Sequence, residues 1–370
     1  MKRVLVIGGT GTMGKPLVCA LYKKNYFVEV VCRHAVDDSR QIKYHIGDAK
    51  DQGFIKEVLS NKYDVIVDFC MYTATEFAEH YDDLLSSCYH YVCLSSSAVY
   101  ANIDGPKKEN SPRYMEVDPP QAGTEKFYWY CYEKARIEDM LCTSKYKNWT
   151  IVRPGMTMND NHFFWGNWID EEWSFRILHN KKVVIPKDML SFKASITYGG
   201  DITQMFMAII ESPEAIGEIY NVISNTIYSW QDLLRLYSDV FKKHGIEMKV
   251  HYVDSCEEIL KYYKDDRYIY ERARLLDRVF DNTKICSLMK DYTFTSIETK
   301  IEEWVNSYIK LYPQKIRNPY VMPTVYLDRL SYDITNKKYF SSDSDYLRYC
   351  LFRFFPFIVY AIRFLRRLIN

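Results

Sequence analysis

Tyr130 and Lys134 are separated by three residues in the run Tyr-Cys-Tyr-Glu-Lys. A phenol in water has a pKa of about 10, so a tyrosine that exchanges protons near neutral pH needs a cation to stabilise its anion. Residues four apart on a helix share one face, so Lys134 could supply that charge. The pair predicts proton transfer between Tyr130 and a substrate hydroxyl. Because the chain contains 33 tyrosines, this spacing alone is a weak signal.

A glycine-rich turn near the N-terminus is a stronger signal. It follows the apolar run Val4–Ile7 and precedes residues 15–22, whose apolar side chains fall on one helical face. A backbone can approach a pyrophosphate only where no Cβ intervenes, and the free N–H groups of the helix start then face the anion. We expect a dinucleotide to contact Gly8, Gly11, Thr12, Met13 and Gly14. A plain tight turn is the alternative.

Strands and helices alternate along the first part of the chain. Apolar, β-branched runs at 27–33, 64–68 and 91–100 are spaced by amphipathic segments. This alternation predicts an α/β fold with a doubly wound parallel sheet, that is, a Rossmann-like fold. We expect this core to occupy residues 1–155.

The order of these features resembles the extended short-chain dehydrogenase/reductase family, and most closely its NAD-dependent epimerase/dehydratase branch. Beyond the glycine turn, the resemblance rests on Gly47-Asp48, on Ser95-Ser96-Ser97 before Val99-Tyr100, on the run from Tyr130 to Glu138, and on Ile151-Val152-Arg153-Pro154-Gly155. It covers residues 1–240 and implies an NAD(P)-dependent enzyme acting on a nucleotide sugar. It also implies a small C-terminal substrate lobe, at 156–330, interleaved with the last core elements.

The same resemblance assigns roles to single residues of the site. Tyr130 would be the acid/base, and Lys134 would also hold the nicotinamide ribose hydroxyls. Ser96 would orient the substrate oxygen, with Ser97 as the fallback in that register. Asp48 would accept a hydrogen bond from the adenine amino group.

Further substrate contacts are expected from an aromatic stretch that begins at residue 161. Trp165 and His162 could contact a base or a sugar, together with Ser97. Burial in the core is the alternative for the tryptophan. No metal ligand set is expected, because the ten cysteines show no Cys-x-x-Cys pairs.

Two departures from the family pattern bear on the reaction and on the cofactor. Dehydratases of the family carry an Asp-Glu pair just after the catalytic threonine, whereas Ser97 and Ala98 stand here, which favours epimerisation or carbonyl reduction. NAD users place an Asp at the end of the second strand, whereas this chain has Cys32 and Arg33. Because a guanidinium pairs with a 2′-phosphate, NADP is favoured over NAD. A solvent-facing Arg33 is the alternative.

Composition bounds the location and the partners. With 48% hydrophobic and 26% charged residues in 370, the chain can bury a large core. A net charge of +1 argues against a nucleic-acid partner. The first strand begins at once, which leaves no room for a secretory signal, so a cytoplasmic location is expected.

The C-terminal segment is apolar and basic. Residues 331–345 have the composition of a linker, and 346–370 contain five arginines among Phe, Leu and Ile. We expect 346–370 to form a basic amphipathic helix, and its apolar run is too short to span a bilayer. It would either lie on the inner face of a membrane or pack on the protein or on a second subunit, as in a homodimer.

Three classes of function remain open from the sequence. An active sugar epimerase or reductase is supported by Ser96, Tyr130 and Lys134 together. A catalytically quiet NAD(P)-binding sensor is the second class. An RNA-associated member of the family is the third, and the near-zero net charge disfavours it.

Overall fold

The chain forms two compact units, each described here by itself. The computed structural model describes residues 2–34, 42–119, 125–160, 162–166, 168–262, 267–311, 321–355 and 357. Unit 1 comprises residues 1–159, 193–227 and 276–297. Unit 2 comprises residues 160–192, 228–275 and 298–370.

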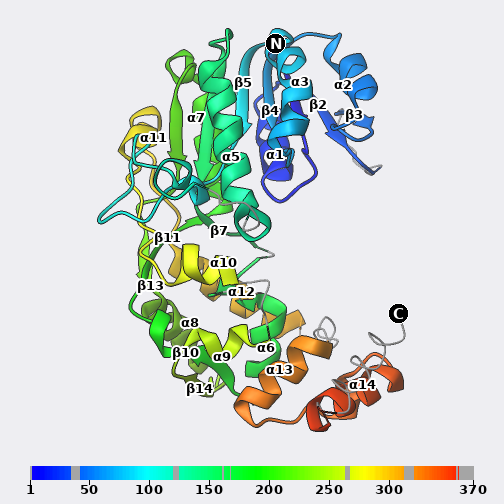
Figure 1. Ribbon diagram of the computed structural model, residues 1–370, viewed down its shortest axis with the longest axis vertical. Helices are drawn as coiled ribbons and strands as arrows, with labels where there is room; N and C mark the ends of the chain where they lie inside the picture. Colours follow the sequence, from blue (N-terminus) through cyan, green and yellow to red (C-terminus); the bar gives the residue numbers. More distant parts are fainter. Residues whose placement is uncertain are drawn as a thin grey trace. The chain divides into compact units, whose positions relative to one another are not determined.

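A seven-stranded sheet is the centre of unit 1, and β2, β3, β4 and β5 of it are labelled in Figure 1. The strand order is β12-β6-β5-β4-β1-β2-β3. Every neighbouring pair in it is parallel. Its strands are β1 (Arg3–Ile7), β2 (Phe27–Cys32), β3 (Lys43–Ile46), β4 (Tyr63–Asp68), β5 (Cys88–Leu94), β6 (Trp149–Pro154) and β12 (Ile219–Val222). The predicted doubly wound parallel sheet is confirmed.

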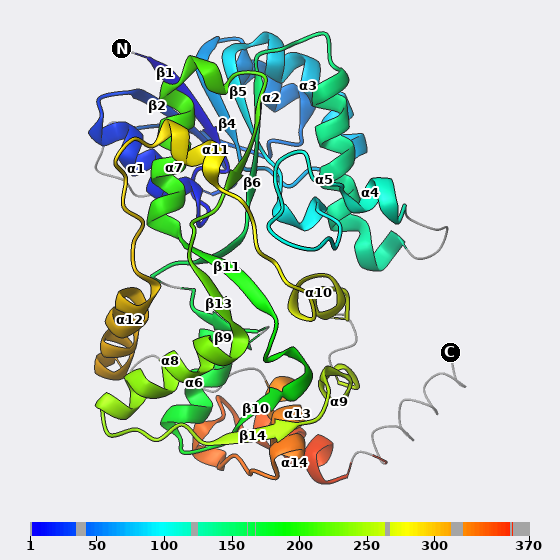
Figure 2. The same cartoon turned by 90° about the vertical axis from the view of Figure 1, so that its left-hand side faces the viewer.

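Side chains on alternate strand positions enter two separate cores. In β1, Val4 and Val6 pack in one core while Leu5 and Ile7 pack in the other, as the period of two in a strand requires. The first core is covered by α1 (Gly14–Lys23), α7 (Gly199–Glu211) and α11 (Thr283–Leu288). The second is covered by α2 (Gln52–Leu59), α3 (Ala74–Ser86) and α5 (Glu125–Thr143), and Figure 2 shows the two sets on opposite faces.

The fifth strand is shorter than the sequence suggests. A strand was expected over 91–100, but β5 ends at Leu94 and a 3-10 turn, η1 (Ser97–Val99), follows. The Ser96 side chain caps this turn by accepting a hydrogen bond from the Ala98 N–H at 3.1 Å. The chain therefore leaves the sheet at the serine cluster, because serine side chains compete for backbone donors and favour turns.

The remaining elements of unit 1 are short. They are α4 (Tyr114–Val117), β7 (Met156–Met158), β11 (Lys193–Tyr198) and η3 (Pro213–Ala215). Strand β11 pairs in parallel with β7.

Unit 2 is mainly helical around an aromatic core. The rings of Trp173 and Tyr237 lie 4.4 Å apart, and those of Trp173 and Trp304 lie 5.5 Å apart. Its helices are α6 (Asp170–Leu178), η2 (Lys187–Met189), α8 (Trp230–Lys243), α9 (Cys256–Leu260), α10 (Arg267–Ile269), η5 (Tyr270–Arg274), α12 (Ile297–Leu311), α13 (Val321–Ser331), η6 (Lys337–Tyr339) and α14 (Asp343–Phe354). Its strands are β8 (Phe164–Trp165), β9 (Trp168–Ile169), β10 (Val183–Pro186) and β14 (Val250–Val253), and β13 (Ile227–Ser229) begins at its border with unit 1.

A buried carboxylate joins the last helices to the rest of unit 2. Asp328 of α13 has no exposed surface and accepts hydrogen bonds from Arg176 at 2.8 Å and from Tyr349 of α14 at 2.7 Å. Lys181 and Thr335 also donate to it, at 3.0 and 2.7 Å. Charged groups buried in this way are stable only when they are paired and hydrogen-bonded.

Because of this cluster, the segments expected to be a linker and a C-terminal helix differ from the prediction. Within residues 331–345, Ser331 and Thr335 are buried and hydrogen-bonded, so this polar segment is part of the packing of unit 2. The helix expected over 346–370 is observed from Asp343 to Phe354, and it ends just before Pro356, where a helix is disfavoured. Residues 358–370 lie outside the described residues.

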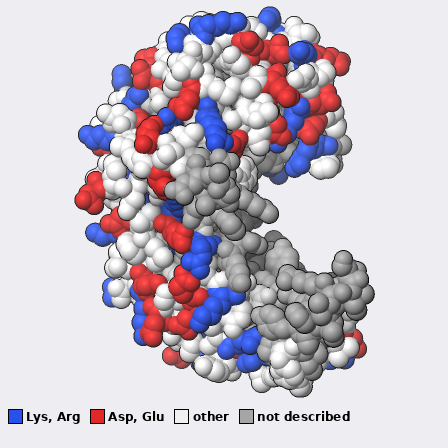
Figure 3. Space-filling model, in the orientation of Figure 1, with Lys and Arg blue, Asp and Glu red and all other residues white. Residues whose placement is uncertain are grey.

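Charge on the surface is mixed. On the face shown in Figure 3, acidic and basic side chains are interspersed over both units. Within the described part of the chain, no helix is both long and apolar enough to cross a membrane.

Candidate active site

The turn from β1 into α1 is built by glycines at two demanding positions. Gly8 has a φ of +76°, which L-residues with a side chain rarely adopt. A Cβ on Gly14 would lie 2.7 Å from the Gly9 Cα, so the start of α1 packs directly on the turn. The Gly11 N–H donates to the Gly8 carbonyl at 3.0 Å, and no acidic side chain lies in the first turn of α1. This geometry leaves an open, anion-compatible helix start.

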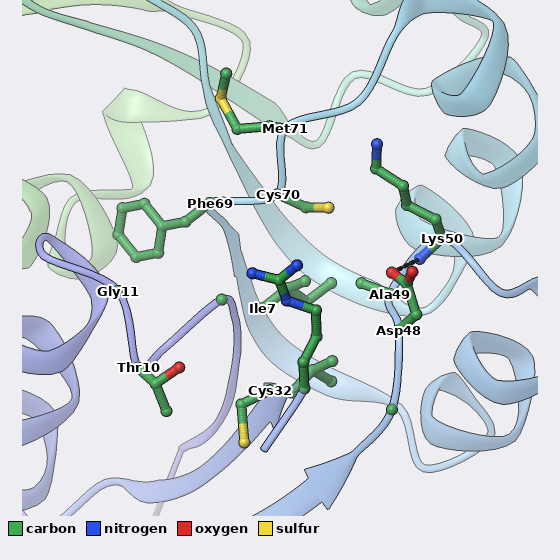
Figure 4. Close-up of a pocket in the computed structure, with 14 residues that line it drawn as sticks. Ile7, Thr10, Gly11, Cys32, Asp48, Ala49, Lys50, Phe69, Cys70 and Met71 are labelled. Atoms are coloured by element: carbon green, nitrogen blue, oxygen red, sulfur yellow. Dashed lines mark hydrogen bonds between the residues drawn. The ribbon is translucent and has the colours of Figure 1, made fainter. Parts of the chain in front are cut away.

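A cavity of about 460 Å³ opens beside this turn, at the carboxyl ends of β1, β2 and β4. Parallel α/β sheets bind their ligands at this edge. Four predicted cofactor contacts are among its lining residues, namely Gly8, Gly11, Arg33 and Asp48. Figure 4 shows Thr10, Gly11 and Asp48 around it.

Other predicted cofactor contacts do not line this cavity. Thr12 and Gly14 are absent from its wall, and Met13 packs against the first core of the sheet. Gly14 instead allows the close approach of α1. Tyr130 and Lys134 are also absent from the wall of this cavity, and they lie with Ser96 beyond the end of β5.

Several lining residues were missed from the sequence. Phe69, Cys70 and Met71 follow β4 and line the cavity, and Phe69 lies next to the glycine turn, 3.3 Å from the position of a Cβ on Gly8 (Figure 4). These residues come directly after the apolar run at 64–68, and this position at a strand end was the available signal. Burial raises the pKa of the Cys70 thiol to about 12, so it stays protonated at neutral pH.

Lys50 is a further lining residue without a motif. Its backbone N–H donates to Asp48 at 3.0 Å, which holds the Asp48 carboxylate at the cavity. Its ammonium pairs with Glu76 of α3 at 2.8 Å. Nothing in the local sequence predicts this pair, because Glu76 comes from another element.

Ser96, Tyr130 and Lys134 come together where β5 ends against α5. The side chain of Ser96 lies near enough to the Tyr130 phenol to act on its pKa through hydrogen bonding. Burial raises the pKa of the Tyr130 phenol, and this interaction opposes the rise. Lys134 is 2% exposed and donates to the Leu94 carbonyl at 2.8 Å. The three side chains expected to act together therefore lie at the carboxyl end of β5.

A buried acidic group lies behind Lys134. Asp68, at the end of β4, accepts hydrogen bonds from the Tyr91 hydroxyl at 2.9 Å and from the Cys70 N–H at 2.8 Å. Burial raises the pKa of Asp68 to about 6, although these hydrogen bonds and the charge of Lys134 oppose the rise. The ammonium and the carboxylate thus interact below the surface of the site.

Glu138 ties α5 to the strand ends. It accepts hydrogen bonds from Ser95 at 2.5 Å and from Arg153 of β6 at 2.6 Å. Arg113 donates to it at 3.1 Å. The side chains of Ser95, Glu138 and Arg153 are all buried, so this network fixes the helix that carries Tyr130.

The three residues expected to contact the substrate lie in different environments. Ser97 is largely buried, and its carbonyl accepts a hydrogen bond from Arg278. Trp165 is 2% exposed in unit 2, and its indole N–H donates to the Trp230 carbonyl at 3.0 Å, which favours the core alternative. His162 is exposed, and partial burial of its ring lowers its pKa.

All ten cysteines are free thiols. Across the described residues, no group of three or more His, Cys, Asp or Glu side chains could hold a metal ion.

Comparison with solved structures defines the class of fold. UDP-glucose 4-epimerase from Thermotoga maritima, solved with UDP-glucose, has a TM-score of 0.63 at 15% identity, over 83% of this chain and 99% of that chain. dTDP-glucose 4,6-dehydratase from Bacillus anthracis, in complex with NAD, has a TM-score of 0.63 at 15% identity, over 84% of this chain and 97% of that chain. The resemblance to extended short-chain dehydrogenase/reductase proteins is therefore confirmed, at the level of the fold.

Similarity in sequence is more limited. No family model matches the chain. A curated relative is the mitochondrial NADH dehydrogenase [ubiquinone] 1 alpha subcomplex subunit 9 of Dictyostelium discoideum, which is 21% identical over 223 residues. The match spans 58% of this chain and about three fifths of the relative, 59%.

Proposed function

We propose that this chain is an NAD(P)-dependent epimerase or reductase that acts on a nucleotide sugar in the cytoplasm. The observation that carries the proposal is the convergence of Ser96, Tyr130 and Lys134 at one strand end, in a sheet that also bears a glycine-lined cavity. The general kind of activity is supported by the fold shared with nucleotide-sugar epimerases and dehydratases.

The residues of the cavity fit a dinucleotide. A Cβ at Gly14 would fill the backbone cradle of the turn, and Gly8 and Gly11 leave room for a pyrophosphate. Asp48 would accept from the adenine amino group. Arg33 would pair with a 2′-phosphate, which favours NADP over NAD.

The chain's own residues would transfer the proton and orient the substrate. A bound nicotinamide would exchange a hydride with a substrate carbon. Tyr130 would exchange a proton with the oxygen on that carbon, and Ser96 would orient this oxygen by a hydrogen bond. Lys134 would stabilise the phenolate through its positive charge. The Asp-Glu pair of the dehydratases is replaced by Ser97 and Ala98, so elimination of water lacks its acid and base.

A second candidate is a nucleotide-binding subunit without turnover. The similarity to a subunit named for NADH dehydrogenase favours it. In that case the cavity would bind a dinucleotide while Tyr130 has no substrate.

The released cofactor separates these candidates. The protein is purified without added nucleotide and denatured, and the small molecules set free are identified by mass spectrometry. Retained NAD or NADP with a nucleotide sugar would support an epimerase that keeps its cofactor. An empty site that binds NADPH on addition and reduces a keto-sugar would support a reductase. Binding without turnover of any nucleotide sugar would favour the subunit, and no binding of either dinucleotide would contradict the proposal.

Arg33 provides the test of cofactor choice. Arg33→Ala should weaken NADPH binding by roughly 10- to 100-fold, the value of a charge-assisted hydrogen bond to an ion, and leave NADH binding unchanged. Lys24→Ala is the matched control, because Lys24 pairs with Glu211 on the surface, away from the lining residues. Equal effects of Arg33→Ala on both dinucleotides would contradict the NADP preference.

We also propose a peripheral membrane contact through the C-terminal residues. Leu347, Leu351 and Phe354 are exposed at helical spacing on α14, and no acidic residue occurs in 346–370. Because Tyr349 is buried against Asp328, the test should spare α14. A double variant, Leu347→Glu with Leu351→Glu, keeps α14 and should lose binding to anionic vesicles without losing thermal stability, because both side chains are exposed. Unchanged vesicle binding would contradict the membrane contact, and a shift from dimer to monomer would indicate a second copy instead.

A further inference from the structure

The guanidinium of Arg278 holds the turn that carries Ser96. Two carbonyl groups border this turn, those of Ser97 and Tyr100. Arg278 donates to the Tyr100 carbonyl at 3.2 Å and, with its other terminal nitrogen, to the Ser97 carbonyl. A planar guanidinium can make both bonds at once, whereas an ammonium has no such fork.

Arg278 is itself fixed in the fold. It is 3% exposed, and its backbone N–H donates to the Lys193 carbonyl at 2.7 Å. Its own carbonyl accepts from the Ser195 N–H at 2.9 Å. The guanidinium lies over the Phe280 ring, 5.1 Å from the centroid. The serine turn is thereby connected to β11, far away in the sequence.

The charge of Arg278 is unusual for a buried residue. In the described part of the chain, no carboxylate lies within ion-pair distance of its guanidinium, and the carbonyls named above are its acceptors. Lys107, with no exposed surface, lies near enough to repel it. Burial lowers the pKa of Arg278 to about 10, although the Tyr114 and Tyr100 phenols oppose this. An unpaired buried cation costs stability, so its position under a catalytic turn suggests a role in function.

We propose that Arg278 is a positioning residue for catalysis, which fixes the Ser96–Tyr100 turn and so holds the Ser96 hydroxyl against the Tyr130 phenol. This inference rests on the proposed function. The Ser96 side chain is the cap of the turn, since it accepts from the Ala98 N–H at 3.1 Å. A shift of the Ser97 carbonyl therefore moves Ser96 as well.

The main test compares two conservative substitutions of equally buried arginines. Arg278→Lys keeps the charge but loses the fork, so kcat should fall on the order of 100-fold, the effect of a small misplacement of a catalytic group. Binding of NADPH should be unchanged, because the lining of the dinucleotide cavity does not include the turn. Arg176→Lys is the control, because Arg176 is 2% exposed in unit 2 and pairs with Asp328. Equal losses of kcat in both variants, or no loss in Arg278→Lys, would overturn the proposal.

A second measurement does not depend on turnover. The ionisation of Tyr130 is followed by NMR in protein labelled at the tyrosine Cζ. The Tyr130 signal is identified as the one that is absent from Tyr130→Phe. Ser96→Ala should raise the pKa of Tyr130, because the hydrogen bond from Ser96 lowers it. Arg278→Lys and Arg278→Met should raise it in the same direction if they misplace Ser96. If Ser96→Ala shifts the pKa and neither Arg278 variant does, the positioning role is wrong. If the wild-type protein turns over no nucleotide sugar, the proposed function fails while this arm still decides the role of Arg278.

Discussion

The carbonyl oxygen of Gly8 lies 2.5 Å from the position that a Cβ would take on Gly14. Two backbone segments therefore meet without any side chain between them. The neighbouring atom belongs to backbone, so it cannot rotate away as the end of a side chain would. This contact sets the position of α1, the first helix that packs on the sheet.

Gly14→Ala should disrupt the turn. We expect a loss of about 1–3 kcal/mol in the free energy of unfolding, the usual cost of overpacking, and a loss of dinucleotide binding. Gly53→Ala in α2 is the control, because its Cβ would be 3.4 Å from the nearest atom, Asp51 Oδ1. It should stabilise the protein by about 0.5–1 kcal/mol. Chemical denaturation and titration with NADPH check both, and normal binding by Gly14→Ala would contradict the close approach.

Tyr130→Phe should abolish most of the turnover. Loss of a general acid/base lowers kcat by roughly 10²- to 10⁴-fold, while NADPH binding is kept. Tyr132→Phe is the matched control, because its hydroxyl donates to the Asp118 carbonyl at 2.6 Å. That variant should lose about 1 kcal/mol of stability and keep its kcat. Steady-state kinetics with the nucleotide sugar identified by mass spectrometry provide the measurement, and an active Tyr130→Phe would exclude the assigned role.

Asp68 should make stability depend on pH. Burial raises its pKa from 3.8 to about 6, so the folded state prefers the protonated acid. Its contribution is fully present below pH 3.8 and is lost as the pH rises through about 6. The difference is about 3 kcal/mol, at 1.36 kcal/mol for each pKa unit.

The comparison of wild type with Asp68→Asn isolates this contribution. The free energy of unfolding of wild type, relative to Asp68→Asn, should fall between pH 4 and pH 7. Urea denaturation at a series of pH values measures it, and parallel curves for wild type and Asp68→Asn would rule out the raised pKa.

Asp328→Ala should destabilise unit 2. Removal of the carboxylate leaves Arg176 and Lys181 buried without it, which costs about 3–5 kcal/mol. Asp343→Ala removes an exposed pair with Lys337 and should cost about 0–1 kcal/mol. Thermal unfolding followed by circular dichroism compares them. Equal melting temperatures would mean that the buried cluster adds little to stability.

The parallel sheet could be predicted because its signals are local. Apolar runs and the glycine turn lie within single elements, and alternate positions such as Val4 and Leu5 enter the two cores as a strand requires. The grouping of Ser96, Tyr130 and Lys134 was predicted from order along the chain. Whether these three side chains come together depends on the fold class, because the fold class determines where β5 and α5 end.

The parts that were missed depend on contacts between distant segments. Arg278 and the carbonyl of Ser97 are 181 positions apart, and no local pattern marks a guanidinium that bonds to two carbonyls. The same holds for Asp328, whose partner Arg176 is 152 positions away. A polar composition at 331–345 predicted a linker, because composition does not reveal that Ser331 and Thr335 are buried.

The Asp328 cluster also bears on how the protein is made. Arg176 and Lys181 leave the ribosome long before Asp328, and Tyr349 follows later still. Chains emerge from the N-terminus at about 5–20 residues per second, so unit 2 keeps two uncompensated cations for many seconds. Its last packing step can occur only after Tyr349 has been synthesised. A nascent chain stalled before residue 328 is therefore expected to have a folded β1–β6 core and a second unit that is a client for chaperones.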